Sequence, residues 1–313
     1  MNSKGHLTRM LSPDASGAAS LPRPGHDQKK AKSAKVSLIT YRVVVYIVLG
    51  ILTFLCLFPF YILLVNSTHS HVEITSRFNW WFGTSFAANW QDLMDDANVP
   101  ILRSTFNSIW LSLLNATITV YFSALTAYGV HIYDFKGKHF VEVFILAIMM
   151  IPSQVSTMSL VIYCIEHGLT NNWLILILPT VASPVVYFYM KQYLESILPY
   201  EIVEAARVDG TSEFGIFHKI VLPIIKPALA VQFIFAYVSN WNNYFTPSML
   251  LDKDEYMTIP LILSRLSDNS NPSNFNMGKV YICMTMAVLP VVVVYFIFSK
   301  AIIKNLTAGS VKG

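Results

Sequence analysis

Long stretches of uncharged, apolar residues are the feature that most limits how this chain can fold. Six of them have 18 or more residues each, enough for a helix to cross roughly 30 Å of hydrocarbon. They cover residues 43–68, 104–130, 143–165, 173–190, 227–251 and 280–299. Backbone polar groups in lipid must be paired within the protein, so stretches of this length are expected to be helices. We therefore predict an all-α polytopic membrane protein with six transmembrane helices.

The composition supports the same fold class. Apolar residues make up 54% of the chain and charged residues 13%, and the mean hydropathy is +0.50. Soluble domains contain roughly 25% charged residues. All three cysteines fall inside apolar stretches, where a free Cys acts as a small hydrophobic residue, so no disulfide framework is expected.

Lys and Arg are distributed unevenly between the segments that separate the apolar stretches. If the N-terminus is inside, the inner segments carry 17 of the 22 basic residues. Those inner segments are 1–42, 131–142, 191–226 and 300–313. Because basic residues concentrate on the cytoplasmic side, we expect both termini to be cytoplasmic. The net charge of +4 then reflects topology and does not indicate nucleic-acid binding.

The two ends of the chain differ from its middle. Residues 1–42 are rich in Ser, Ala, Pro and Lys and contain no apolar run, which predicts a disordered cytoplasmic tail. We expect a six-helix transmembrane domain over residues 43–303 and a cytoplasmic C-terminal tail over residues 304–313. Between the last two stretches, residues 252–278 are interpreted as a long polar outer loop.

A polar segment, residues 198–224, separates the fourth and fifth stretches. Pro199 suits the first position of a helix, where its missing N–H would be unpaired anyway, and Glu201 suits the positive end of the helix dipole. Gly210 can adopt the left-handed conformation that ends a helix. Hydroxyl side chains after it can cap a second helix, whose far end Pro223 is expected to limit. The segment therefore predicts a helix, a sharp turn and a second helix.

The first of these helices has a composition that suits a cleft in a partner protein. Ala205 and Ala206 carry only methyl groups, so a partner surface can approach their backbone closely. Glu204 and Asp209 offer charge-assisted acceptors to basic groups. An ordinary amphipathic loop helix is the alternative when the alanine pair is taken by itself.

The apolar stretches contain no charged residue near their middle, where such a residue costs about 2.5–3.5 kcal/mol and is usually retained only for function. Uncharged polar residues occur there instead. We assign to a pathway for a neutral, hydroxyl-rich solute the residues Gln154, Gln232, Ser239, Asn240, Asn243 and Tyr244. Three- and four-residue spacing places Gln232, Ser239 and Asn243 on one helix face. Hydrogen bonding between helices is the alternative role.

Aromatic residues near this polar face have two interpretations. Tyr237, Trp241 and Tyr244 can stack on sugar rings. For Trp241 and Tyr244, an aromatic belt at the membrane interface explains the same residues.

Metal and nucleotide sites are not expected in this chain. His69 and His71 are separated by one residue, so both side chains can lie on one side of an extended segment. Glu73 is their one nearby acidic partner, so we interpret them as part of a solvent-exposed extracellular loop and not as a metal site. Gly210 and Gly215 have the spacing of two P-loop glycines. Ile216 stands where that loop needs its phosphate-binding Lys, so we predict no ATP site here.

The spaced pattern E-A-A-x3-G-x9-I-x-L-P over residues 204–223 resembles the EAA loop of the membrane-spanning subunits of ABC importers. The tail over residues 306–313 is similar to the G-L-T-x-G-A-V-K-G ending of maltose-type sugar permeases, from which it departs at two positions. Trp241-Asn242 followed by Pro247 is similar to a W-N-x4-P stretch of the same group. The resemblance covers most of residues 43–313.

This resemblance implies a type I ABC importer permease fold, a partner set and a division of labour. The chain would form half of a pore with a second permease subunit, bound to two ATPase subunits and supplied by an extracellular or periplasmic solute-binding protein. The ATPases would bind ATP and Mg, and this chain would hold no cofactor and no catalytic residue. It would lie in a prokaryotic plasma or inner membrane. The residues implied in ATPase coupling are Glu204, Ala205, Ala206, Asp209, Gly210, Ile220, Leu222 and Pro223.

Other functions are weighed against a sugar-importer permease. A secondary transporter subunit would move solute without ATPase partners, and a membrane enzyme would need His, Asp, Glu or Ser residues converging at one depth. An ABC permease for a non-sugar solute is the third alternative. A charged solute would be accepted more easily with Arg or Lys in its path.

Overall fold

The structure is a computed structural model that describes residues 24–268 and 275–310, and every regular element there is helical. Residues 1–23, 269–274 and 311–313 lie outside the described part. The chain divides into two compact units, Met1–Phe60 and Tyr61–Gly313. Each unit is described by itself.

The first unit contains most of helix α1 (Pro24–Ser67). Its apolar part, Ile39–Ser67, is the first candidate membrane span. The prediction of a disordered tail is wrong for residues 24–42, which are helical. Four of these residues are Lys and two are Ala. Both residue types are good helix formers, so a polar composition did not prevent a helix. The rest of the predicted tail, residues 1–23, is outside the described residues.

Sixteen helical elements follow α1 in the described part of the chain. They are α2 (His71–Ser76), α3 (Phe86–Met94), α4 (Ile101–Ile132), α5 (Lys138–Met149), α6 (Ser153–Glu166), α7 (Trp173–Ile177), η1 (Leu178–Val181), α8 (Pro184–Ile197), α9 (Tyr200–Val208), α10 (Glu213–Ile216), η2 (Phe217–Val221), α11 (Leu222–Trp241), α12 (Phe245–Leu250), η3 (Asp254–Tyr256), α13 (Ile259–Ser267) and α14 (Met277–Ser310). Since α14 continues to Ser310, most of the predicted C-terminal tail is helical too.

Five helices or helix runs in the described residues are long and apolar enough to cross a membrane, and a bent pair can make a sixth span. That pair is α5 and α6, which meet at an angle of 88°. The predicted span over residues 143–165 is therefore a bent pair of helices and not one continuous helix. Pro152 explains the break, because the residue before a proline is pushed out of the helical conformation and proline has no N–H to donate.

The fifth span also differs from its prediction over residues 227–251. It starts earlier, at Glu213, and ends at Trp241. Asn242 and Asn243 then interrupt the helix, and α12 follows as a separate element. Asn side chains compete with the helical backbone for hydrogen bonds. The mean hydropathy of the whole stretch does not show this local effect.

Helix α4 lies at the centre of the second unit, packed against α8 and α11, while α11 also packs against α14. The buried face of α4 carries small polar residues at three- and four-residue spacing: Ser104, Asn107, Ser108, Ser112, Asn115, Thr119 and Ser123. Small side chains let membrane helices approach closely.

The polar side chains of α4 also pair backbone groups where neighbouring segments are not α-helical. The Asn107 amide donates to the carbonyls of Glu255 and Met257 at 3.0 and 2.9 Å. The Thr119 hydroxyl donates to the Thr180 carbonyl in η1 at 2.9 Å. These bonds allow irregular backbone to exist beside membrane helices.

The predicted outer loop over residues 252–278 is partly helical. It contains η3 and α13, whose Ile259, Leu261 and Ile262 are buried. Only its middle, residues 269–274, falls outside the described residues.

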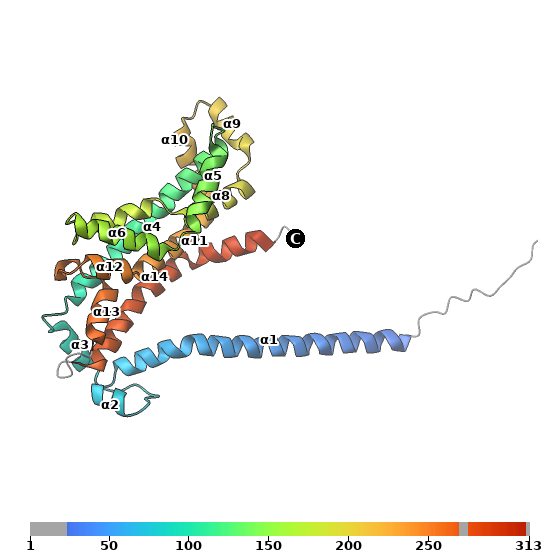
Figure 1. Cartoon of the computed structure of the whole chain (residues 1–313). Helices are drawn as coiled ribbons and strands as arrows, with labels where there is room; N and C mark the ends of the chain where they lie inside the picture. Colours follow the sequence, from blue (N-terminus) through green and yellow to red (C-terminus); the bar gives the residue numbers. More distant parts are fainter. Residues whose placement is uncertain (1–23, 269–274, 311–313) are drawn as a thin grey trace, which may run out of the picture. The chain divides into compact units, whose positions relative to one another are not determined.

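Figure 1 shows α9 and α10 near the C-terminal end of α4, with α3 and α13 toward the other end.

Candidate functional site

The helix that carries the Glu-Ala-Ala triplet, α9, begins and ends as its sequence dictates, with one shift. Pro199 is the residue before the first turn and not its first member. Gly210 adopts the left-handed conformation, with φ of +76°. The N–H groups of Gly210 and Thr211 then donate to the carbonyls of Arg207 and Ala206, each at 3.0 Å. Ser212 caps α10 by accepting from the N–H of Gly215 at 3.3 Å.

The two faces of α9 have different environments. Val203 and Ala206 are buried in the core of the second unit, to which α9 belongs, so the open face does not include Ala206. Glu204, Ala205 and Val208 are exposed, and Val208 is 87% exposed. Their spacing places them on one side of the helix. Asp209 is exposed at the end of the same helix, so the face that a partner can reach is apolar and acidic.

A cluster of three side chains, the Arg207–Glu213–Tyr133 clamp, joins α9 to α10 and to the end of α4. The Arg207 Nε donates to the Glu213 carboxylate at 2.7 Å, and the Tyr133 hydroxyl donates to the same carboxylate. The Arg207 guanidinium also lies over the Tyr133 ring, 5.5 Å from its centroid. Burial, followed by the Glu213 carboxylate, raises the pKa of Tyr133, so its hydroxyl remains a donor at neutral pH.

The second helix of the segment does not stop at Pro223 as predicted. Elements α10, η2 and α11 form one continuous run from Glu213. Pro223 lies within this run, two residues after the end of the π-helical turn η2, where the regular hydrogen-bond pattern is already interrupted. The η2 element is a π-helical turn, a form frequent at functional sites. Ile220 and Leu222 flank its end, half-buried against the core.

A second connection to α4 lies one turn beyond the clamp. His218 Nδ1 is 2.8 Å from the Phe214 carbonyl, so this nitrogen carries the proton. Nε2 then accepts from the Tyr121 hydroxyl at 3.1 Å. The run that starts beside α9 is therefore fixed to α4 at two points.

Gly210 offers a test of how strictly this turn is needed. Gly210→Ala is expected to lower stability by about 1–2 kcal/mol through backbone strain alone, because a Cβ there would meet nothing within 4 Å. Gly210→Asn should cost less, since Asn tolerates this conformation better than other residues with a Cβ. Thermal unfolding of the purified complexes measures both. Equal stability of the Ala variant and the wild type would contradict a required left-handed turn.

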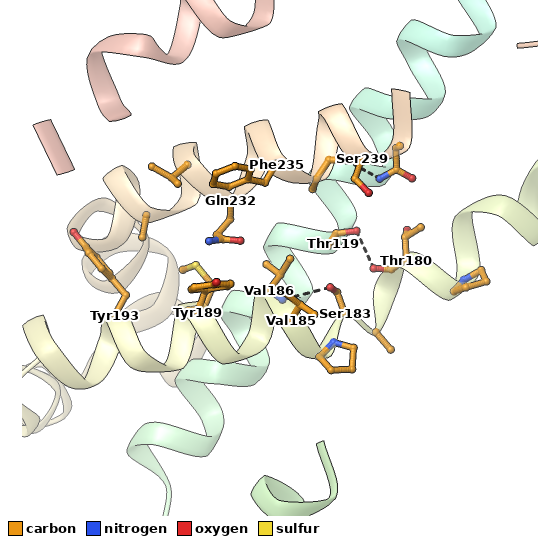
Figure 2. Close-up of a pocket in the computed structure, with 18 residues that line it drawn as sticks. Thr119, Thr180, Ser183, Val185, Val186, Tyr189, Tyr193, Gln232, Phe235 and Ser239 are labelled. Atoms are coloured by element: carbon orange, nitrogen blue, oxygen red, sulfur yellow. Dashed lines mark hydrogen bonds between the residues drawn. The ribbon is translucent and has the colours of Figure 1, made fainter. Parts of the chain in front are cut away.

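An open pocket of about 850 Å³ lies between η1, α8 and α11, with α4 behind it. Figure 2 shows Gln232 pointing from α11 toward α8, with Tyr189 and Phe235 nearby. Gln232 is buried, and its amide makes no hydrogen bond to any described residue. Ser239 and Asn240 line the same pocket. None of the 18 lining residues is charged.

Three of the predicted pathway residues lie elsewhere. Asn243 follows the end of α11, so it is not on the helix face of Gln232, and it lines a separate small cavity. Tyr244 lines a third pocket, where its hydroxyl is 3.2 Å from that of Ser264. Gln154 is exposed in the first turn of α6 and does not line the pocket that contains Gln232.

The aromatic residues predicted to stack on sugar are mostly unavailable. Tyr237 and Trp241 are 1% and 3% exposed, and the Trp241 indole donates to the Ala287 carbonyl in α14 at 3.0 Å. Asn240 also has a structural role, because it accepts from Asn115 at 3.0 Å and donates to the Ala236 carbonyl at 2.8 Å.

Sequence reasoning missed the α8 side of the pocket. Its members Thr180, Ser183, Tyr189 and Tyr193 lie in or beside the fourth apolar stretch. The available signal was Thr180 and Ser183 between Pro179 and Pro184, since two closely spaced prolines mark a break in a membrane helix. The prediction that His69 lies in a solvent-exposed loop was also wrong, because His69 is buried.

In the described residues, no group of three or more His, Cys, Asp or Glu is placed to hold a metal.

Comparison with known proteins identifies what the chain is similar to. The family profile described as "Binding-protein-dependent transport system inner membrane component" matches residues 120–307. The chain is 33% identical to the arabinooligosaccharides transport system permease protein AraQ of Bacillus subtilis (strain 168), over 87% of this chain and 96% of AraQ. It is 30% identical to the lactose transport system permease protein LacG of Rhizobium radiobacter, over 86% and 96% of the two chains.

A solved structure shares the fold. It is a chain from the crystal structure of a bacterial ABC transporter involved in the import of the acidic polysaccharide alginate. The TM-score is 0.73 with 23% sequence identity, covering 84% of this chain and 97% of that one. The likeness confirms an all-helical permease fold.

Proposed function

Because this chain belongs to the family of binding-protein-dependent ABC transporter permeases, we propose that it forms half of the pore of an ATP-driven importer for a neutral sugar or oligosaccharide. Membership confirms the resemblance drawn from the EAA loop. The family has no catalytic site of its own, and partner ATPase subunits use the ATP. It also places the chain in a bacterial inner-membrane transporter as a multi-pass component.

The observation that carries the proposal is the continuity between the exposed face of α9 and the wall of the pocket. The clamp joins Arg207 in α9 to Glu213, where the run of α10, η2 and α11 begins. The same run carries Gln232 and Ser239 into the pocket. A movement imposed on α9 by an ATPase is therefore transmitted to pocket residues without crossing a flexible linker.

The free energy needed to switch the pore between two states requires that the clamp hold α9 and α10 rigidly together. Driving a two-state pore from 1:99 to 99:1 takes about 5.5 kcal/mol of differential binding. A ligand or partner shifts the two states only by the difference in its affinity for them. We propose that ATP and Mg in the partner ATPases alter the fit around Glu204, Ala205, Val208 and Asp209, and that the clamp makes α9 and α10 move as one body.

The solute class follows from the lining of the pocket. Gln232, Ser239 and Thr180 offer hydrogen bonds, and Tyr189 and Phe235 offer exposed aromatic rings. Hydrogen-bonding groups combined with aromatic faces suit a hydroxyl-rich ring, and the uncharged lining does not favour an ionic solute. The relatives named for arabinooligosaccharides and lactose support the carbohydrate assignment.

The partner subunits are proposed from the family, and the orientation in the membrane is proposed from the distribution of Lys and Arg. A second permease subunit would complete the pore as a heterodimer, and an extracellular or periplasmic solute-binding protein would supply the sugar. Both termini and α9 would face the cytoplasm, where 17 of the 22 Lys and Arg residues then lie. A secondary transporter would not need this docking helix.

Gln232→Leu tests the pocket. The change keeps most of the side-chain volume but removes the amide, so sugar uptake in reconstituted liposomes is expected to fall severalfold while the yield of complex is unchanged. Gln232 makes no bond to another described residue that would be lost.

Asn240→Leu is the matched control on the same helix. It removes the bonds to Asn115 and to the Ala236 carbonyl, so yield is expected to fall at least as much as uptake. Unchanged uptake in Gln232→Leu, or loss of yield in that variant alone, would contradict a pathway through this pocket.

A further inference from the structure

The segment that leads from α2 into the first residue of α3 carries exposed aromatic side chains that the transport site does not use. We call residues 78–86 the aromatic loop. Its five aromatic residues are Phe78, Trp80, Trp81, Phe82 and Phe86. Each is at least 46% exposed, and Trp81 is 80% exposed. None of the nine residues in the loop is charged. An exposed group of this size is unusual on a surface that meets only water.

The aromatic loop runs back beside the last turns of α1. The Tyr61 hydroxyl donates to the carbonyl of Trp80, and the rings of Tyr61 and Phe82 meet edge to face with centroids 6.2 Å apart. Val65 is the last residue of the apolar run, four positions after Tyr61. At the helical rise, Tyr61 lies about 6 Å inside the end of that run. The loop is therefore level with an apolar part of the span.

The backbone of the aromatic loop is paired with the protein at the positions nearest α1. His69 Nε2 donates to the Trp81 carbonyl at 2.9 Å. The Gly83 N–H donates to the Thr68 hydroxyl, and the Ser85 N–H donates to the Thr68 carbonyl, both at 2.8 Å. Non-helical backbone is tolerated near lipid only when its polar groups are satisfied in this way.

Two features hold the loop in this position. A Cβ on Gly83 would lie 2.6 Å from the Thr68 carbonyl oxygen, so only glycine permits the close approach. The buried His69 is held on its other side by Glu73, with Nδ1 3.2 Å from the carboxylate. Hydrogen bonds from the Ser70 N–H, His69 and the Ser70 hydroxyl hold the pKa of Glu73 below its usual value, so this carboxylate stays charged near neutral pH.

We propose that the aromatic loop inserts into the interfacial region of the adjacent lipid leaflet and anchors this end of the permease in the bilayer. Trp and other aromatic rings prefer this depth, where an apolar body and a wet edge are both accommodated. A water-soluble partner would have to reach below the end of the span to cover the loop. The paired backbone and the absence of charge fit lipid and do not provide the polar rim of a protein interface.

Nitroxide labels in the intact transporter, reconstituted into nanodiscs of phosphatidylcholine, test the depth of the loop. Trp81→Cys is labelled in a Cys56→Ser background, because Cys164 and Cys283 are buried and Cys56 is exposed. Collisions with oxygen, which concentrates in lipid, are compared with collisions with a water-soluble nickel chelate. Asp95→Cys, an exposed position beyond the end of α3, is the matched control.

The proposal predicts that oxygen relaxes the label at position 81 severalfold more than the nickel chelate does. At position 95 the nickel chelate should relax the label more than oxygen does. If Trp81→Cys does not assemble, Phe82→Cys carries the same expectation. Equal access of the nickel chelate to both positions would show a loop in water and overturn the proposal. Exclusion of both reagents from position 81 would show a protein partner over the loop and would overturn it as well.

Discussion

Glu204→Lys is expected to reduce ATP-driven sugar uptake more than tenfold while the protein still inserts into the membrane. Glu204 is exposed on the face of α9 that also carries Ala205 and Val208. A hydrogen bond to a charged partner contributes about 1.5–3 kcal/mol, and a Lys in its place repels that partner. Because about 1.4 kcal/mol corresponds to tenfold in affinity, docking should weaken beyond that factor.

Glu166→Lys is the matched control for this charge reversal. Glu166 is also exposed, but it ends α6, far along the chain from the EAA loop. Uptake and the amount of co-purified ATPase should remain near wild type in this variant. Wild-type uptake by Glu204→Lys, with stoichiometric ATPase bound, would show that Glu204 has no role in docking.

Gly278→Ala is expected to have the largest effect on folding. A Cβ at this position would lie 2.3 Å from the Oδ1 atom of Asn89. Asn89 cannot move away without loss, because its amide donates to the carbonyls of Ser67 and His69 at 3.1 and 2.8 Å. Overpacking costs about 1–3 kcal/mol, and each lost hydrogen bond adds about 1 kcal/mol. The unfolding temperature of the purified complex should fall by several degrees.

A second glycine provides the comparison. Gly129 lies inside α4, where an added Cβ would meet nothing within 4 Å, so Gly129→Ala should be neutral or stabilising by up to about 1 kcal/mol. Adding Asn89→Ala to Gly278→Ala removes the clash and should restore part of the lost stability. Equal unfolding temperatures for the two glycine variants would contradict the tight contact between α3 and α14.

The fold class was predictable because lipid leaves a chain few choices. Apolar length and the lack of charge were sufficient to predict helices at all six stretches. They did not predict the break at Pro152 or the end of the fifth span at Trp241. Both depend on local backbone chemistry, which a count of apolar residues over a whole stretch does not include. Residues 24–42 show the converse, a helix in a polar segment that burial does not require.

The local structure of residues 198–224 was more predictable than the pocket. Gly210 and the capping hydroxyl of Ser212 act locally, so their roles follow from neighbouring residues. Whether a polar side chain in a span faces a pocket or another helix depends on partners distant in the sequence. Asn240 bonds to Asn115 in α4, whereas Gln232 on the same helix is left to face the pocket. The clamp between Arg207 and Tyr133 was missed for the same reason.

Photo-cross-linking from α9 tests most directly whether its exposed face binds the ATPase. A benzophenone amino acid replaces Val208, with the similarly exposed Met150, at the break between α5 and α6, as the control position. In a complex whose ATP hydrolysis is stimulated by substrate, position 208 should cross-link to a subunit that carries a P-loop sequence, identified by mass spectrometry, and position 150 should not. A complex that contains stoichiometric ATPase but gives no such cross-link from position 208, or gives it equally from position 150, would contradict docking at α9.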